Sequence, residues 1–147
     1  MVKRPINEVK RQIAFYRDTL TGKQPAKEFL CELSKKSDKK SQVAFKKFPV
    51  YANVLLMLGA RLCGENYVKK IMGIREDIWE LRPGDARIFF VTMLKQIDEG
   101  GNLVETYILL HGFQKRTNKT PQKEIERAQR EYQALQNGEA EIVKDGG

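Results

Sequence analysis

Histidine and cysteine are scarce in this chain: its 147 residues include one histidine and two cysteines. Cys31 and Cys63 stand far apart in the sequence and far from His111. They therefore show neither the spacing of a metal-binding motif nor a disulfide framework, and only carboxylates remain as metal ligands. We expect no metal and no cofactor, and a reducing compartment, the cytoplasm, as the place where the protein acts.

Long apolar segments are missing as well. No stretch approaches the roughly 18 apolar residues that a membrane helix needs. The first residues, MVKRPINEVKRQ, carry charge without the apolar core of a secretory signal. We therefore expect no membrane span, no secretory signal and no membrane partner.

Acidic residues are outnumbered by basic ones. The chain has 27 Lys and Arg against 19 Asp and Glu, a formal net charge of +8 and a pI of about 9.5. This balance favours an anionic partner, either a nucleic acid or an acidic protein, and does not separate the two. The length and the 41% hydrophobic content predict one globular domain with a single core.

The first half of the chain reads as one strand and two helices. Residues 1–11 are basic and predict a flexible lead-in, and the alternation in residues 12–17 predicts an edge strand. Pro25 suits the first turn of a helix, and apolar residues spaced by three and four carry that helix to about Ser37. Asp38 can cap a second helix that ends at Gly59. Pro49 lies inside this second helix and predicts a kink or a split.

The second half is rich in β-structure and ends in a charged helix. After residues 71–75, the segments 78–82, 87–94 and 103–110 are joined by short turns and predict an antiparallel meander. Residues 121–136 form a helix whose apolar stripe is thin, so we expect it on the surface. Residues 137–147 should fray, which leaves 12–136 as the domain. The predicted class is α+β: a small antiparallel sheet packed on two N-terminal helices, with the other face partly open.

The segment 108–121, ILLHGFQKRTNKTP, contains the strongest functional pattern. A short apolar run leads to His111 and Phe113, and Lys115, Arg116 and Lys119 follow with no acidic residue among them. Cations and a flat ring suit phosphate contact and base stacking, and an imidazole can transfer protons near neutral pH. In the alternative interpretation, His111 is only a hydrogen-bonded residue, Phe113 is core, and the cations are a solvated face.

Several segments together resemble a known family. They are PAKEFL at 25–30, WELR at 79–82, RIFF at 87–90, LLHGF at 109–113 and KRTNKTP at 115–121. Over about residues 13–132 the chain resembles the HigB-like, phage-related branch of the RelE/ParE toxin superfamily. The resemblance implies a RelE/ParE-like α+β fold and a toxin of a type II toxin–antitoxin system. Such relatives cut mRNA, commonly on the ribosome, and a cognate antitoxin silences them.

The resemblance also implies a metal-independent endoribonuclease site. Arg82 and Arg87 flank the turn 83–85 and resemble the arginines of the family's active surface, where a planar guanidinium grips two phosphate oxygens. His111 is the best available general acid or base. In the structural alternative, Arg82 only pairs with Glu80 or Asp85.

Other cations and one aromatic complete the expected surface. The residues expected to bind RNA are Lys69, Lys70, Phe113, Lys115, Arg116 and Lys119. We also expect an acidic antitoxin segment to bind the open sheet face and the His111 segment. Two alternatives stay open, because fold alone does not determine function: a non-catalytic ParE-like inhibitor of DNA gyrase, and a non-toxic nucleic-acid-binding domain.

Overall fold

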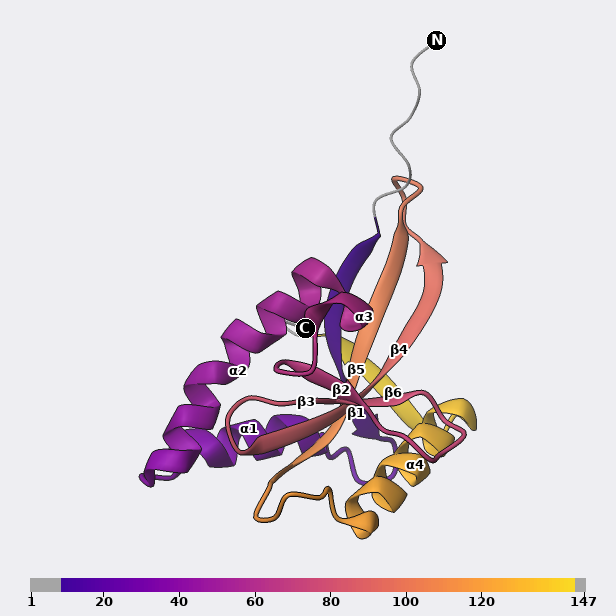
Figure 1. Cartoon of the computed structure of the whole chain (residues 1–147). Coiled ribbons are helices and arrows are strands. Elements are labelled where there is room, and N and C mark those ends of the chain that lie inside the picture. The colour runs from indigo at the N-terminus through magenta and orange to yellow at the C-terminus, as the bar shows by residue number, and fades with distance from the viewer. Residues whose placement is uncertain (1–8, 145–147) are drawn as a thin grey trace.

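A single six-stranded sheet organises the protein, with helices on both of its faces (Figure 1). The computed structural model describes residues 9–144, except for the side chains of residues 94–96. The strands are β1 (Lys10–Asp18), β2 (Val68–Lys70), β3 (Ile78–Leu81), β4 (Ala86–Ile97), β5 (Leu103–Gln114) and β6 (Ala140–Lys144). The helices are α1 (Pro25–Lys35), α2 (Lys39–Leu58), the short α3 (Ala60–Cys63) and α4 (Gln122–Gln136). The predicted α+β class is confirmed.

The sheet is mostly antiparallel, in the order β2-β3-β4-β5-β1-β6. The predicted meander is present as β3, β4 and β5, which pair antiparallel. The prediction of an edge position for residues 12–17 is wrong, because β1 lies between β5, with which it is parallel, and β6, with which it is antiparallel. The β-structure before β3 is Val68–Lys70 rather than residues 71–75.

The two helices of the first half cover one face of the sheet. Pro25 occupies the first turn of α1, and the Asp38 side chain accepts a hydrogen bond from the Ser41 backbone N–H at the start of α2. α2 runs through Pro49 as one continuous helix, so the predicted split does not occur. Leu55 of α2 is fully buried against strand residues such as Phe90 and Leu109.

The C-terminal helix covers part of the other face, which corrects the expectation that it lies loosely on the surface (Figure 1). Ala128 of α4 is fully buried in a second core with Phe89, Ile108 and Leu110. The apolar stripe of α4 is thin because polar contacts, described below, replace part of it.

The expectation of a frayed tail is also not met where the structure describes it. Residues Ala140–Lys144 form β6 and pair with β1. The predicted flexible lead-in includes Lys10 and Arg11, which begin β1; residues 1–8 and 145–147 lie outside the described part. No helix in that part is long and apolar enough to cross a membrane.

Candidate functional site

A β-bulge in β5 decides where His111 points. Phe90 of β4 is opposite Leu109, and Ile88 is opposite Gly112, so two steps along β4 match three along β5. The extra residue breaks the alternation of side chains between the two faces. His111 therefore joins Leu110 on the face covered by α4, instead of facing α1 and α2.

The residue after His111 must be small. A Cβ added at Gly112 would lie 2.3 Å from Cδ2 of the Phe29 ring, which belongs to α1. His111 and Gly112 thus contact helices on opposite faces of the sheet. The imidazole packs against α4, and the backbone of Gly112 packs against an aromatic ring of α1.

His111 is enclosed by two carboxylates of α4. Its side chain is 1% exposed, its Nδ1 contacts the carboxylate of Glu131, and its Nε2 lies 3.2 Å from Oε1 of Glu124. Glu131 also pairs with Arg127, at 3.5 Å. Burial, followed by the charge of Glu131, raises the pKa of the nearby Tyr16. We call His111, Glu124 and Glu131 the histidine clamp, because these contacts tie β5 to α4.

The two arginines expected at the site lie at a different place, around the turn between β3 and β4. Nη1 of Arg87 donates to the backbone oxygens of Gly84 and Ala86, both at 2.8 Å. Arg87 is only 8% exposed, and its Nε has no hydrogen-bond partner among the described residues. Desolvation of a polar group without a partner is costly, so this buried N–H is an unsatisfied donor of the guanidinium.

Arg82 is held by one backbone contact and one carboxylate. Its Nη1 donates to the backbone oxygen of Glu65 at 2.7 Å, and its Nε lies 3.8 Å from Oε1 of Glu80. Glu80 is 2% exposed and accepts a hydrogen bond from the Thr120 hydroxyl at 3.2 Å. The pairing of Arg82 with Glu80 in the structural alternative is therefore present. At 3.8 Å it is too long to be a hydrogen bond, and Nε of Arg82 also lacks such a partner in the described part.

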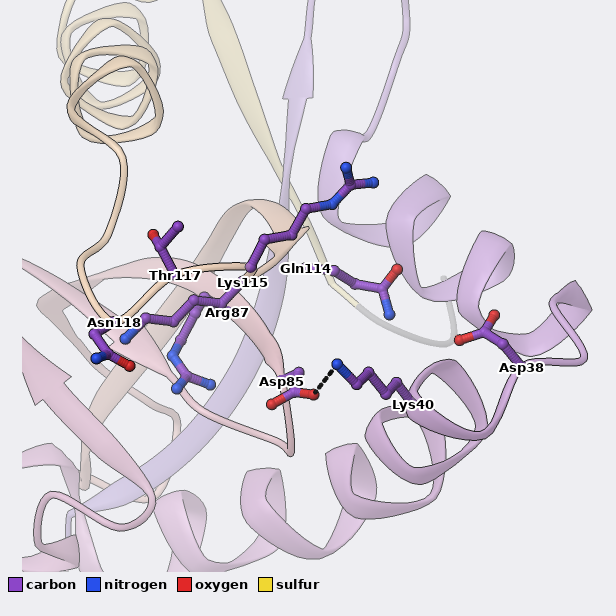
Figure 2. A pocket seen from close by; sticks show the side chains of 9 residues that line it. Asp38, Lys40, Asp85, Arg87, Gln114, Lys115, Thr117 and Asn118 are labelled. Atoms are coloured by element: carbon purple, nitrogen blue, oxygen red, sulfur yellow. Dashed lines mark ion pairs between the residues drawn. The ribbon is translucent and has the colours of Figure 1, made fainter.

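Arg87 lines a first pocket, which has a volume of about 520 Å³. Figure 2 shows Arg87, Lys115 and Asn118 on one side of this pocket, with Asp38 and Lys40 across from them at the start of α2. The charged residues that line it are four cations and two carboxylates: Lys40, Arg87, Lys115, Arg116, Asp38 and Asp85. Figure 2 marks an ion pair across it, from Lys40 Nζ to Asp85 Oδ2, which are 3.9 Å apart. Positive charge is thus in excess.

Arg87 also lines a second, smaller pocket of about 250 Å³. Arg82 and Gly84 lie on its sheet side, and Lys47 and Tyr51 come from α2. The turn 83–85 and Arg87 therefore separate two basic pockets that share one buried guanidinium.

Burial and, after it, neighbouring cations lower the pKa values of two basic side chains here. Burial, followed by the charge of Arg82, lowers the pKa of Arg87. Burial, followed by the charge of Arg87, lowers the pKa of Lys115. Both effects disfavour the charged forms of the side chains, and an anion bound between them would reverse them. Such perturbed groups in a pocket are typical of a functional site.

Of the remaining residues predicted to bind RNA, some lie at the two basic pockets and others lie elsewhere. Lys69 lies opposite Glu80 in the sheet and contributes to the field on Lys115, and Arg116 lines the first pocket. Lys70 pairs with Asp77 at 3.4 Å. Lys119 is exposed. Phe113 is partly buried and packs against the second core, where its ring centroid lies 5.6 Å from that of Phe89.

The sequence interpretation did not single out Glu80, Tyr51 or the two lysines of α2 as site residues. Lys40 and Lys47 are seven residues apart, a helical spacing that puts both on one face, but four lysines in α2 share such spacings. Only the tertiary neighbours of Lys40 and Lys47 distinguish these two lysines from the other two.

Residues 32–133 match the model of a family described as phage-derived protein Gp49-like (DUF891). The chain belongs to this Gp49-like family. The matched residues include both basic pockets and the histidine clamp. No curated protein gives a significant match to the Gp49-like chain.

Proposed function

We propose that this Gp49-like protein is a HigB-like member of the RelE/ParE superfamily and the toxin of a type II toxin–antitoxin system. In this proposal it cuts mRNA as a metal-independent endoribonuclease, works on the ribosome and blocks translation. The observation that supports it best is Arg87: a buried guanidinium with an unpartnered Nε among the described residues, between two basic pockets. Such a fork is suited to phosphate oxygens.

The proposed reaction uses the RNA's own nucleophile. The ribose 2′-oxygen attacks the adjacent phosphorus and loses its proton to solvent water, the bond to the 5′-oxygen breaks, and that oxygen takes up a proton. The products are a 2′,3′-cyclic phosphate and a 5′-hydroxyl. Arg82 and Arg87 stabilise the extra negative charge on the phosphoryl oxygens, and fixed donors of this kind act most strongly where water is excluded.

Lys115 is the proposed proton donor to the leaving 5′-oxygen. It lines the first pocket beside Arg87, and its pKa is lowered by burial and by the neighbouring arginine. A lysine with a lowered pKa gives up its proton more readily, as general acid catalysis requires. Lys69, Arg116 and Lys119 are the proposed contacts for flanking phosphates, whereas Lys70 contributes only to the general field.

His111 has no catalytic step in this proposal, although the sequence suggested one. Its ring is almost fully buried and both nitrogens face carboxylates, so RNA reaches it only if α4 moves away. We propose that His111 positions α4, and with α4 the loop 115–121 beside the pockets.

A partner protein completes the proposal. The cognate antitoxin neutralises the toxin by presenting an acidic segment to this basic surface, and the pair resides in the cytoplasm. Residues 12–136 form the proposed toxin domain, extended by β6. Because exposed charges are screened over about 8–10 Å at physiological ionic strength, toxin–antitoxin affinity should fall as salt rises.

Induced expression combined with mapping of RNA 5′ ends tests the function. The expected result is growth arrest with new 5′ ends inside coding regions, both lost in Arg87→Ala. Arrest with intact mRNA and gyrase-dependent DNA breaks would replace the nuclease by a gyrase inhibitor. Normal growth with RNA binding would leave only a nucleic-acid-binding domain.

A further inference from the structure

Two lysines of α2 stand at equivalent places beside Arg87. Lys40 lines the first pocket and Lys47 the second. Seven residues of helix separate them, so they lie on one face about 10 Å apart along the helix axis. Ala44 lies between them and is fully buried.

The turn between β3 and β4 rests on α2 at that point. A Cβ added at Gly84 would lie 3.4 Å from the Cα of Ala44, and φ at Gly84 is +62°. This close approach lets Arg87 reach from the sheet toward the helix, with one lysine on each side. A bulkier turn would push the two walls apart.

The charge on this helix is not neutralised from within. α2 contains four lysines and no Asp or Glu. Lys40 has one partner, Asp85, at 3.9 Å and with both side chains exposed, and such a pair contributes little. Within the described part of the chain, Lys47 has no ion pair. Both amines are therefore free to exchange water or a weak partner for a phosphate.

We propose that α2 forms one wall of a single-stranded RNA-binding track, in which Lys40 and Lys47 hold the phosphates on either side of the phosphate bound by Arg87. The ligand is an RNA segment with at least three consecutive phosphates, read by its backbone rather than its sequence. This inference rests on the proposed function in taking RNA as the ligand. It adds a helix that the sequence resemblance did not assign to the site.

The helix provides its own control. Lys39 and Lys46 are also seven residues apart and are exposed. They line neither of the two basic pockets in the described structure. Lys40→Ala/Lys47→Ala and Lys39→Ala/Lys46→Ala therefore remove the same charge from the same helix, from different faces. Thermal melts of both double variants verify that each is folded.

Binding is measured with a fluorescent 2′-O-methyl RNA of about 12 nucleotides, which lacks the nucleophile and spans the whole track. For Lys40→Ala/Lys47→Ala we expect Kd to rise on the order of tenfold at low salt. The slope of log K against log salt should fall by about 1.4, or about 0.7 for each lost phosphate contact on a single strand. The control pair should change both quantities by less than half as much. A 2′-O-methyl dinucleotide, with one phosphate, should bind all three proteins equally.

If both double variants lost the same amount of RNA-binding affinity, the track would be overturned, because the loss would then follow from net charge alone. A comparable loss on the dinucleotide would overturn it too, since the lysines would act at the central phosphate. Cleavage of an unmodified mRNA on ribosomes, where the proposed nuclease works, is scored separately. Wild-type binding with the predicted difference but no cleavage rejects the nuclease and keeps the track, whereas cleavage with identical double variants rejects the track and keeps the nuclease.

Discussion

Arg87 and His111 lie on neighbouring strands and are both almost fully buried, yet their polar atoms are satisfied to different degrees. His111 has a carboxylate at each ring nitrogen. Arg87 donates two hydrogen bonds to backbone oxygens through Nη1 and keeps an unpartnered Nε among the described residues. Its charged neighbours are of both signs: Arg82, Lys115, Glu80 and Asp85. The polar network around His111 is satisfied, whereas that around Arg87 is incomplete.

Incomplete pairing of a buried polar group is the better guide to function in this protein. Buried polar groups in native proteins are nearly always paired, so an exception calls for an explanation. A paired group such as the histidine clamp contributes to holding two layers together. An incompletely paired cation at a pocket retains binding capacity for an anion. We therefore propose that the lone histidine, which sequence alone singles out, is a scaffold residue and that Arg87 is a site residue.

The largest expected effect is on stability, from His111→Ala. It leaves the carboxylates of Glu124 and Glu131 facing each other without the imidazole, and breaking a buried pair typically costs about 3–5 kcal/mol. Urea unfolding should show this loss, while the cleavage rate per folded molecule should fall by less than it does in Arg87→Ala, because His111 only positions α4 and the loop 115–121. Glu131→Gln, which removes one of the two charges, should cost less. A variant that unfolds like wild type but no longer cuts RNA would return His111 to the catalytic site.

Arg87→Ala should have the next largest effect, on rate. Losing one fixed donor to a developing oxyanion lowers the rate by about 10²–10³, and the cleavage of a defined mRNA on ribosomes measures it. Arg87→Lys should recover only part of the rate, because an ammonium lacks the planar fork. Arg75→Ala, at an exposed arginine, is the matched control. If both alanine variants cut equally well, Arg87 is not part of the active site.

Gly112→Ala tests the close packing at the bulge in β5, next to His111. The new Cβ would collide with the Phe29 ring, and overpacking of this kind costs about 1–3 kcal/mol. A thermal melt should show the loss, and Phe29→Leu in the same chain should restore part of it. Gly100→Ala, where a Cβ meets only flexible polar side chains, should be nearly silent. An unchanged melt for Gly112→Ala would mean that this glycine is not closely packed.

The smallest effect near neutral pH concerns Lys115. If its ammonium donates the proton, the rate is full below its pKa and falls as pH rises through it, and that pKa lies below the ordinary value of 10.5. Rate profiles at alkaline pH should show this fall in wild type and lose it in Lys115→Arg, whose side chain stays protonated. Lys119→Ala should keep the profile of wild type and only weaken binding. A flat alkaline profile in wild type would remove Lys115 as the donor.

Much of the fold was predictable because its elements are locally encoded. Pro25 and the stripe after it predicted α1, Asp38 and Gly59 bounded α2, and turn residues separated the strands of the meander. The position of β1 was not predictable, since its parallel pairing with β5 joins residues about ninety positions apart. The coverage by α4 was missed because part of its contact with the sheet is polar rather than apolar.

The class of fold, the excess of positive charge and the two arginines on either side of one turn can all be read from the sequence. Which polar side chains are fully paired in the folded protein depends on contacts between distant segments. The bulge turned His111 toward α4, and the approach of Gly84 to Ala44 brought the lysines of α2 beside Arg87. The physical reason is that spacing along a chain encodes local periodicity, whereas the pairing of a buried polar group depends on partners from distant segments.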